Sequence, residues 1–289
     1  MPLGTIILLG TFAGFTIYMG LPLAFLKHLP QSLKVFLIML ATGVLVFLLF
    51  DVLSKASDPI NAALDQVRTH HTGVGTFTLD VCLLIAGIAL GSVGLVYVQR
   101  YAFGRVRTSR VMPGEARADA GSAVQGGAAS AGPLSTQGEL SSRQLSLLIA
   151  TGIGLHNFSE GLAIGQSAAV GALQLAIVLM IGFGLHNMTE GFGIAGPLTG
   201  QSVSWPFIAL LGLIGGGPTF LGTVVGTLFD SPQVFILFLA LAAGAIIYVV
   251  AELFGVAKRF KAPELVMWGV LLGFLLGYVT DLVVIFGGA

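Results

Sequence analysis

The chain has 289 residues, of which 55% are hydrophobic and only 9% are charged, and its mean hydropathy is +0.96. These values exclude a soluble globular domain and indicate an all-α, multi-pass protein embedded in a lipid bilayer. The formal net charge of zero argues against nucleic acid as a partner. The single cysteine, Cys82, excludes an internal disulfide, and its apolar surroundings predict a small core residue.

Stretches of about 20 apolar residues predict membrane-spanning helices. Eight such stretches occur in the sequence, and the proline at position 22 predicts a kink in the first of them. The predicted spans cover residues 3–26, 32–54, 78–100, 143–169, 172–198, 205–229, 233–256 and 265–287.

Basic residues are distributed unevenly between the connections that join these spans. Eleven of the thirteen Lys and Arg residues lie in, or within three residues of, the connections between the first and second, third and fourth, or seventh and eighth spans. Cytoplasmic connections are enriched in Lys and Arg, so these three connections are expected inside the cell and both termini outside it. We expect the protein to lie in the cell membrane.

The chain is therefore expected to fall into three parts. Residues 1–103 carry the first three spans and residues 143–289 carry the other five. Between them, residues 104–142 are rich in Gly, Ala, Ser and Arg and have no hydrophobic period, which predicts a flexible cytoplasmic loop.

Polar residues lie at the end of the second span and at the start of the third. Asp51 and Lys55 are one helical turn apart. They either form a solvated helix end or place Asp51 at the mouth of a transport pathway. Residues 56–77 are expected to form an outside loop. Asp80 follows that loop and is a candidate for lining an entrance.

The most informative feature is a repeat in the fourth and fifth spans. GIGLHNFSEGLAI at residues 152–164 recurs as GFGLHNMTEGFGI at residues 182–194, with eight of thirteen positions identical. Each copy places a histidine and a glutamate one turn apart on one helix face, with an asparagine beside them. The residues are His156, Asn157 and Glu160 in the first copy and His186, Asn187 and Glu190 in the second.

Two imidazoles and two carboxylates suit a divalent transition metal, Zn²⁺ above all. Neither apolar run contains a Lys or Arg that would neutralise its glutamate. A carboxylate at membrane depth is costly, so these residues are functional candidates, and a dication would offset the cost. The alternative is that the histidines and glutamates only hydrogen-bond each other within a packed bundle.

The two copies lie on consecutive spans that run in opposite directions. A two-fold axis in the membrane plane can therefore relate them, an arrangement typical of secondary transporters with a midplane site. Ser159 and Thr189 precede the two glutamates, and their hydroxyls can bond the carbonyl four residues back and bend the helix.

These features together resemble the Zrt/Irt-like (ZIP) transporters of divalent metals. The resemblance rests on the HNFSEG and HNMTEG helices, the eight spans, the outside termini and the long connection after the third span. It implies a bundle with an inverted 3+2+3 arrangement, in which two three-helix repeats surround the fourth and fifth helices. It also implies movement of Zn²⁺, or of Cd²⁺, Fe²⁺ or Mn²⁺, into the cytoplasm as substrate, with no catalytic cofactor.

The resemblance extends to individual residues. It makes the four histidines and glutamates the primary metal ligands and the two asparagines neighbouring oxygen donors. Glu252 in the seventh span and Asp281 in the eighth match acidic positions, either on the metal pathway or in interhelical hydrogen bonds. Asn187, and Gly217 before Pro218, stand where relatives with two adjacent metals place carboxylates, which favours one metal.

Two other functions fit the same residues. An intramembrane metal-dependent hydrolase would use the ligands around an activated water, but the sequence has no HExxH motif. A proton-coupled carrier of an organic solute would use them only to relay protons. The transporter reading predicts that the protein is not an enzyme.

Glycines spaced four residues apart predict close packing between helices. They do not decide between a monomer and a homodimer.

Overall fold

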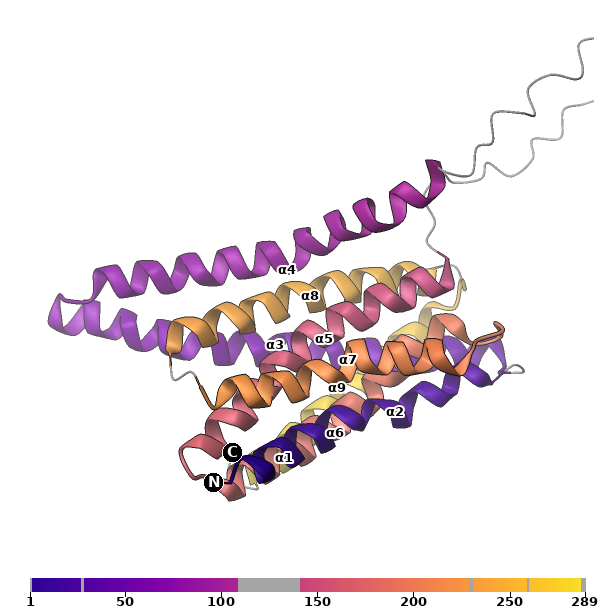
Figure 1. Ribbon diagram of the computed structural model, residues 1–289. Helices are drawn as coiled ribbons and strands as arrows, with labels where there is room; N and C mark the ends of the chain where they lie inside the picture. Colours follow the sequence, from indigo (N-terminus) through magenta and orange to yellow (C-terminus); the bar gives the residue numbers. More distant parts are fainter. Residues whose placement is uncertain (1, 27–28, 109–140, 229–230, 259, 287–289) are drawn as a thin grey trace, which may run out of the picture.

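The computed structural model describes residues 2–26, 29–108, 141–228, 231–258 and 260–286 (Figure 1). Within these ranges all regular structure is helical, and eight segments are long and apolar enough to cross a membrane, as predicted. The elements are α1 Leu3–Phe15, α2 Ile17–Gly20, the 3₁₀ helix η1 Leu21–Phe25, α3 Gln31–His70, α4 Val74–Thr108, α5 Ser142–Ala169, α6 Leu173–Ala195, the 3₁₀ helix η2 Gly196–Leu198, α7 Trp205–Gly226, α8 Pro232–Lys258 and α9 Pro263–Phe286.

The first span is interrupted twice. The α-helix breaks at Thr16 and resumes in α2, and the chain then tightens into η1, which has Pro22 at its beginning. Proline lacks the N–H that an α-helix interior requires, which accounts for the second interruption. The predicted irregularity at Pro22 is therefore confirmed.

The predicted outside loop at residues 56–77 is wrong, because α3 continues as a helix to His70. At 1.5 Å per residue its 40 residues extend about 60 Å, roughly twice the thickness of a bilayer core. Ala56, Ile60 and Ala63 keep one face of the extension buried. His71 and Gly73 then adopt positive φ in the turn into α4, which forms the projecting hairpin in Figure 1.

The connection between α4 and α5 falls mainly on residues 109–140, which lie outside the described residues. The predicted flexible loop at 104–142 therefore stays a prediction, although α4 remains helical through Thr108. The prediction that Cys82 is a core residue is wrong, since its side chain is exposed on the outer face of α4.

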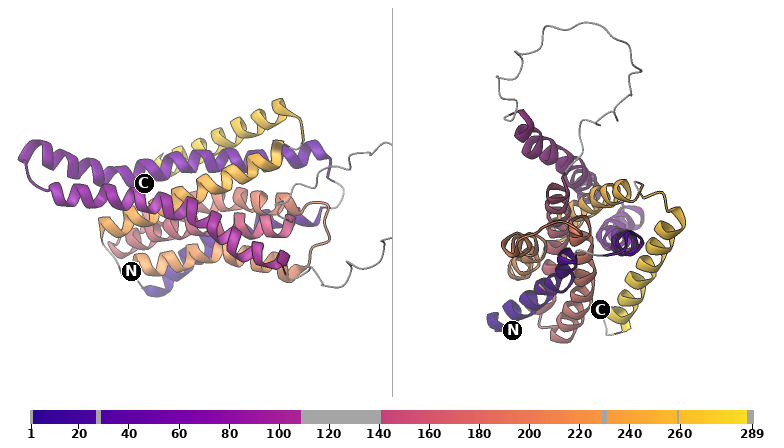
Figure 2. Two further views of the ribbon diagram at one scale, coloured as in Figure 1. Left: turned by 90° about the horizontal axis from the view of Figure 1, so that it is seen from above. Right: turned by 90° about the vertical axis from the view of Figure 1, so that its right-hand side faces the viewer.

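Helices α5 and α6 form the centre of the bundle. α5 packs mainly against α7 and α8, whereas α6 packs against α1, α2 and α3. The outermost helices complete the bundle, with α4 on α8 and α9 on α3 (Figure 2). Both described chain ends lie at one end of the bundle, opposite the end where α4 stops and α5 begins (Figure 1).

The predicted close helix packing through glycines is confirmed within the chain. Gly161 and Gly165 of α5 face backbone carbonyls of α7, and Gly222 and Gly226 of α7 face backbone carbonyls of α5. A Cβ atom at any of these four positions would collide with the neighbouring backbone. These contacts fix α5 at the centre, with its polar residues held among neighbouring helices.

Candidate metal site

The repeated histidines and glutamates lie on α5 and α6 and are enclosed by the bundle. His156 and Glu160 belong to α5, and His186 and Glu190 belong to α6. None of the four exposes more than 5% of its surface. Both helices carry glycines around the motif, so neighbouring backbones approach closely and exclude solvent.

The structure brings the four side chains together in a row of neighbouring pairs. His156 Nε2 lies 3.2 Å from Glu160 Oε1 and 3.9 Å from Glu190 Oε1. Glu160 Oε1 in turn lies 3.9 Å from His186 Nδ1. Ligands of a tetrahedral zinc ion with bonds of 2.0–2.1 Å are about 3.3 Å apart, so these spacings are close to those of a coordination shell.

The donor atoms lack the hydrogen bonds that buried polar atoms normally make. Both carboxylates and His156 lie in the bundle interior without a hydrogen-bond partner at either polar atom, and His186 Nδ1 has none. Such atoms are rare in folded proteins and indicate an ion or water that satisfies them. Among the described residues, however, no group of three or more His, Cys, Asp or Glu side chains is already arranged to hold an ion.

The two asparagines have the same role on their two helices. Asn157 Nδ2 donates to the carbonyl of Gly215 on α7 at 2.9 Å, and Asn187 Nδ2 donates to the carbonyl of Ala13 on α1 at 2.8 Å. Their Oδ1 atoms are buried without a partner. Because the amide nitrogens are engaged, the oxygens remain free to accept a metal ion or its water.

Each accepting carbonyl lies beside an irregularity in its helix. Ala13 comes just before the break at Thr16, whose hydroxyl also donates to the Ala13 carbonyl. Gly215 comes three residues before Pro218, whose missing N–H leaves the carbonyl of the neighbouring Ile214 without its helical donor. The asparagines therefore bond backbone carbonyls close to these two positions, beside the break in α1 and beside Pro218 in α7.

The hydroxyls of Ser159 and Thr189 make equivalent hydrogen bonds to the backbone of their own helices. Ser159 Oγ donates to the His156 carbonyl at 2.6 Å, and Thr189 Oγ1 donates to the His186 carbonyl at 2.7 Å. The acceptor is three residues back instead of the four expected from the sequence. Both hydroxyls thus stabilise the turn that carries the histidine and the glutamate.

A residue that the sequence analysis did not single out contacts the site from α9. The Thr280 hydroxyl lies in hydrogen-bond contact with His186 Nε2, and it also donates to the Gly277 carbonyl at 2.7 Å. When the hydroxyl donates to the carbonyl it accepts from the ring, and this pairing requires the imidazole tautomer with the proton on Nε2. His186 Nδ1 then holds the lone pair and faces Glu160.

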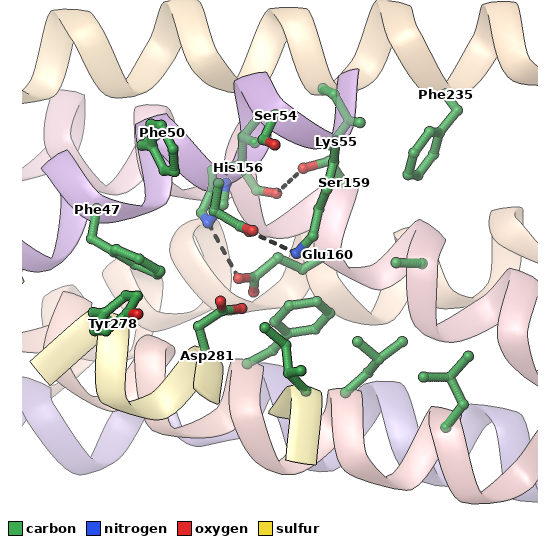
Figure 3. Close-up of a pocket in the computed structure, with 18 of the residues that line it drawn as sticks. Phe47, Phe50, Ser54, Lys55, His156, Ser159, Glu160, Phe235, Tyr278 and Asp281 are labelled. Atoms are coloured by element: carbon green, nitrogen blue, oxygen red, sulfur yellow. Dashed lines mark hydrogen bonds and ion pairs between the residues drawn. The ribbon is translucent and has the colours of Figure 1, made fainter. Parts of the chain in front are cut away.

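A cavity of about 610 Å³ leads to one side of this cluster. His156, Ser159 and Glu160 line its inner part, and Figure 3 shows His156 and Glu160 close to Asp281. Aromatic and aliphatic side chains cover most of the remaining wall. The cavity is therefore a mainly apolar space with a few polar groups gathered at one place, as is usual for binding sites of small ligands.

Asp51 and Lys55 line the same cavity, with a 2.7 Å ion pair between Lys55 Nζ and Asp51 Oδ2. The reading of this pair as a solvated helix end is wrong, because α3 continues for fifteen residues beyond Lys55. The Asp51 side chain is only 17% exposed. The sequence could not show that the helix continues, nor which face of it meets α8 and α9.

Two other acidic candidates lie away from the cavity. Asp80 is 2% exposed and accepts a hydrogen bond from Gln233 Nε2 at 3.1 Å. Glu252 is half-buried in the second half of α8, one turn after Tyr248, whose hydroxyl donates to Gln99. Neither residue belongs to the cavity lining or to the histidine–glutamate cluster.

On the opposite side of the cluster the bundle is closed by apolar packing. Ile38 near the start of α3, Ile149 near the start of α5 and Ile194 near the end of α6 are almost fully buried. Ser146 adds a buried hydrogen bond from its hydroxyl to the Ile194 carbonyl, which ties α5 to α6 there. Within the part of the chain that the structure describes, this packing covers the side of the cluster opposite the cavity.

Comparison with known proteins agrees with this geometry. A family model described as "ZIP Zinc transporter" matches residues 107–281, which is more than half of the chain and includes both copies of the repeated motif. No individual curated protein matches the chain significantly.

Proposed function

Because the chain belongs to the ZIP zinc transporter family, whose members are membrane transporters of divalent metal ions, we propose that it carries Zn²⁺ into the cytoplasm through the cluster on α5 and α6. Cd²⁺, Fe²⁺ and Mn²⁺ are the other candidate substrates, since affinity at mixed nitrogen and oxygen sites follows a general order that geometry modifies. His156, Glu160, His186 and Glu190 are the proposed ligands, and Asn157 and Asn187 supply neighbouring oxygens.

One observation carries the proposal: buried donor atoms from both helices face one another without hydrogen-bond partners. Two buried carboxylates that form no ion pair with a Lys or Arg among the described residues are costly unless a cation compensates them. A divalent metal would compensate both at once and would accept the histidine lone pairs. Mutual hydrogen bonding alone does not account for the cluster, because the closest pair does not satisfy the polar atoms of His156 or Glu160.

The position of the cavity supports movement from outside to inside. Its walls come from the middle of α3, the later parts of α5 and α9 and the early parts of α6 and α8. These parts of α5, α6, α8 and α9 lie toward the end of the bundle where the chain begins and ends. The distribution of Lys and Arg predicts that this end faces outward. The cavity then leads from the outside to His156 and Glu160, near the middle of α5.

A two-fold relation between the halves is also part of the proposal. The two-fold relation would exchange α5 with α6, α1 with α7, α3 with α8 and α4 with α9. Under this exchange the packing of α4 on α8 corresponds to the packing of α9 on α3. The same exchange turns the Asn157 bond to α7 into the Asn187 bond to α1. These matches support the inverted 3+2+3 arrangement, with the metal bound between its two central helices.

Inward release requires the packing around Ile38, Ile149 and Ile194 to open. A rearrangement of the flanking helices against α5 and α6 would expose the cluster to the other side, and Glu252 on α8 lies toward that side. A single site that opens alternately to each side would let the metal cross without a continuous pore. The metal exchanges water for protein ligands on the way in and regains it on release.

The direct test is zinc uptake into sealed liposomes that contain a metal-responsive dye. The wild type is compared with the double variant His156→Ala, His186→Ala, after protein insertion is verified for both. Uptake by the wild type alone, slowed by external Cd²⁺, is the expected result. No uptake by a correctly inserted wild type would reject the proposal, and the preparation would then be assayed for hydrolase or organic-solute transport activity.

A further inference from the structure

Lys55 introduces a positive charge into the cavity through which a metal cation would arrive. It is the one Lys or Arg among the cavity-lining residues that the structure describes. Its ammonium forms the 2.7 Å ion pair with Asp51, and both side chains belong to the same face of α3, one turn apart. Asp281 and Glu160 line the same space, so three carboxylates share one ammonium.

We propose that Lys55 is a built-in counter-ion for Asp51 that keeps monovalent cations out of the cavity and gives way only to a divalent metal. This role deepens the proposed transport function and rests on it. It makes Lys55 a residue that sets selectivity, not a ligand of the metal. The ion pair, the enclosed position of Asp51 and the shared cavity carry the proposal.

The physical basis is competition for the same carboxylate. An open cavity with three carboxylates would attract Na⁺ or K⁺, which are far more abundant in solution than transition metals. The ammonium is held beside Asp51 by its own helix, so its competition for the carboxylate does not depend on the composition of the solution. A dication interacts twice as strongly as a monovalent ion with each carboxylate at a given distance, so it can displace the ammonium.

A second contact provides an alternative position for the displaced Lys55 ammonium. Lys55 Nζ lies over the ring of Phe183 on α6, 5.9 Å from the ring centroid, which is at the outer limit of a cation–π contact. Phe183 also lines the cavity. The lysine can therefore leave Asp51 toward the aromatic face without entering the apolar interior unpaired, and the metal can take its place beside Asp51.

The test compares Zn²⁺ uptake by the wild type, Lys55→Met and Lys55→Arg in the liposome assay. Each is measured in NaCl and in N-methylglucamine chloride at equal ionic strength, because the large organic cation screens charge but approaches a carboxylate less closely than Na⁺ does. Lys258→Met is the matched control, since it removes an exposed lysine at the opposite end of α8. Equilibrium Zn²⁺ binding to detergent-purified protein is measured in the same two salts.

In the organic salt, Lys55→Met should lower the half-saturating Zn²⁺ concentration about fivefold, as expected for removing one charge roughly 8 Å from a dication in water. NaCl should reverse most of that gain. For the wild type, Lys55→Arg and Lys258→Met, the half-saturating Zn²⁺ concentration should differ less than twofold between the two salts. Asp51→Asn, which leaves the ammonium unpaired, should raise the half-saturating concentration.

If Lys55→Met matches the wild type in both salts, the counter-ion role is wrong even though transport stands. If the wild type takes up no metal, the transport proposal fails instead. The binding measurements then still decide the role of Lys55, because Na⁺ must compete with Zn²⁺ in Lys55→Met and not in the wild type.

Discussion

The Thr280 hydroxyl on α9 contacts Nε2 of His186 on α6, and its own proton is donated to the backbone of α9. This arrangement suits the tautomer with the proton on Nε2, and Nδ1 is the ring nitrogen that faces Glu160. Groups that orient a metal-binding histidine commonly change metal affinity by 10–100-fold when they are removed. A residue outside the repeated motif thus contacts and orients one of the proposed ligands.

Replacing Thr280 with valine should therefore weaken Zn²⁺ binding about tenfold while the protein remains folded. Valine keeps the shape of threonine but cannot accept the Nε2 proton. Thr280→Ser is the matched control and should bind as the wild type does, since it keeps the hydroxyl. Calorimetric titration of purified protein gives the affinities, and equal affinity for Thr280→Val and Thr280→Ser would show that the contact does not orient His186.

The buried glutamates should lower the stability of the metal-free protein. Glu160→Gln and Glu190→Gln each remove a buried charge and keep the side-chain shape, so each variant is expected to gain about 1–3 kcal/mol in free energy of unfolding without metal. Both should lose most of their Zn²⁺ binding. Thermal unfolding in detergent with a chelator and with excess Zn²⁺ measures both effects.

The wild type should be stabilised by Zn²⁺ and the two glutamine variants should not. A loss of stability in the chelator for both variants would mean that the carboxylates are compensated within the protein, and the argument from buried charge would then be wrong.

Much of this structure follows from the sequence, and the exceptions have physical causes. Hydropathy located all eight spans because a bilayer imposes a minimum apolar length. It missed the helical extension after Lys55, since residues that leave the membrane become polar while the helix continues. The repeat identified His156 and Glu190, but Thr280 reaches His186 across 94 residues of sequence, a relation that no local pattern reveals.

The two asparagines should contribute similarly to stability if they have equivalent roles. Asn157→Ala and Asn187→Ala each leave a buried backbone carbonyl without its side-chain donor, which costs about 1–3 kcal/mol. Asn61→Ala, on the exposed extension of α3, should change the stability by less than about 0.5 kcal/mol. Thermal unfolding of the three variants provides the comparison, and a large effect at only one of the two buried positions would contradict the two-fold relation.

Acidification of the outside solution should weaken uptake. Histidine and glutamate bind metal in their deprotonated forms, so protons compete with Zn²⁺, and occupancy falls as the pH decreases. For each proton displaced per metal bound, the half-saturating Zn²⁺ concentration should rise up to tenfold per pH unit. Uptake measured at several outside pH values, with the inside buffered, gives this dependence, and tighter apparent binding at low pH would be inconsistent with these ligands.

The accessibility of the two sides of the cluster can be tested with cysteines, because the natural chain has only Cys82. In a Cys82→Ser background, Ser54→Cys places a thiol on the cavity wall, and Ser146→Cys places one in the packed region opposite. A membrane-impermeant thiol reagent added outside should label Ser54→Cys and leave Ser146→Cys unlabelled. Labelling of Ser54→Cys only from the inside would reverse the proposed orientation, whereas labelling of Ser146→Cys from outside would mean that the apolar packing around Ile194 does not close the site.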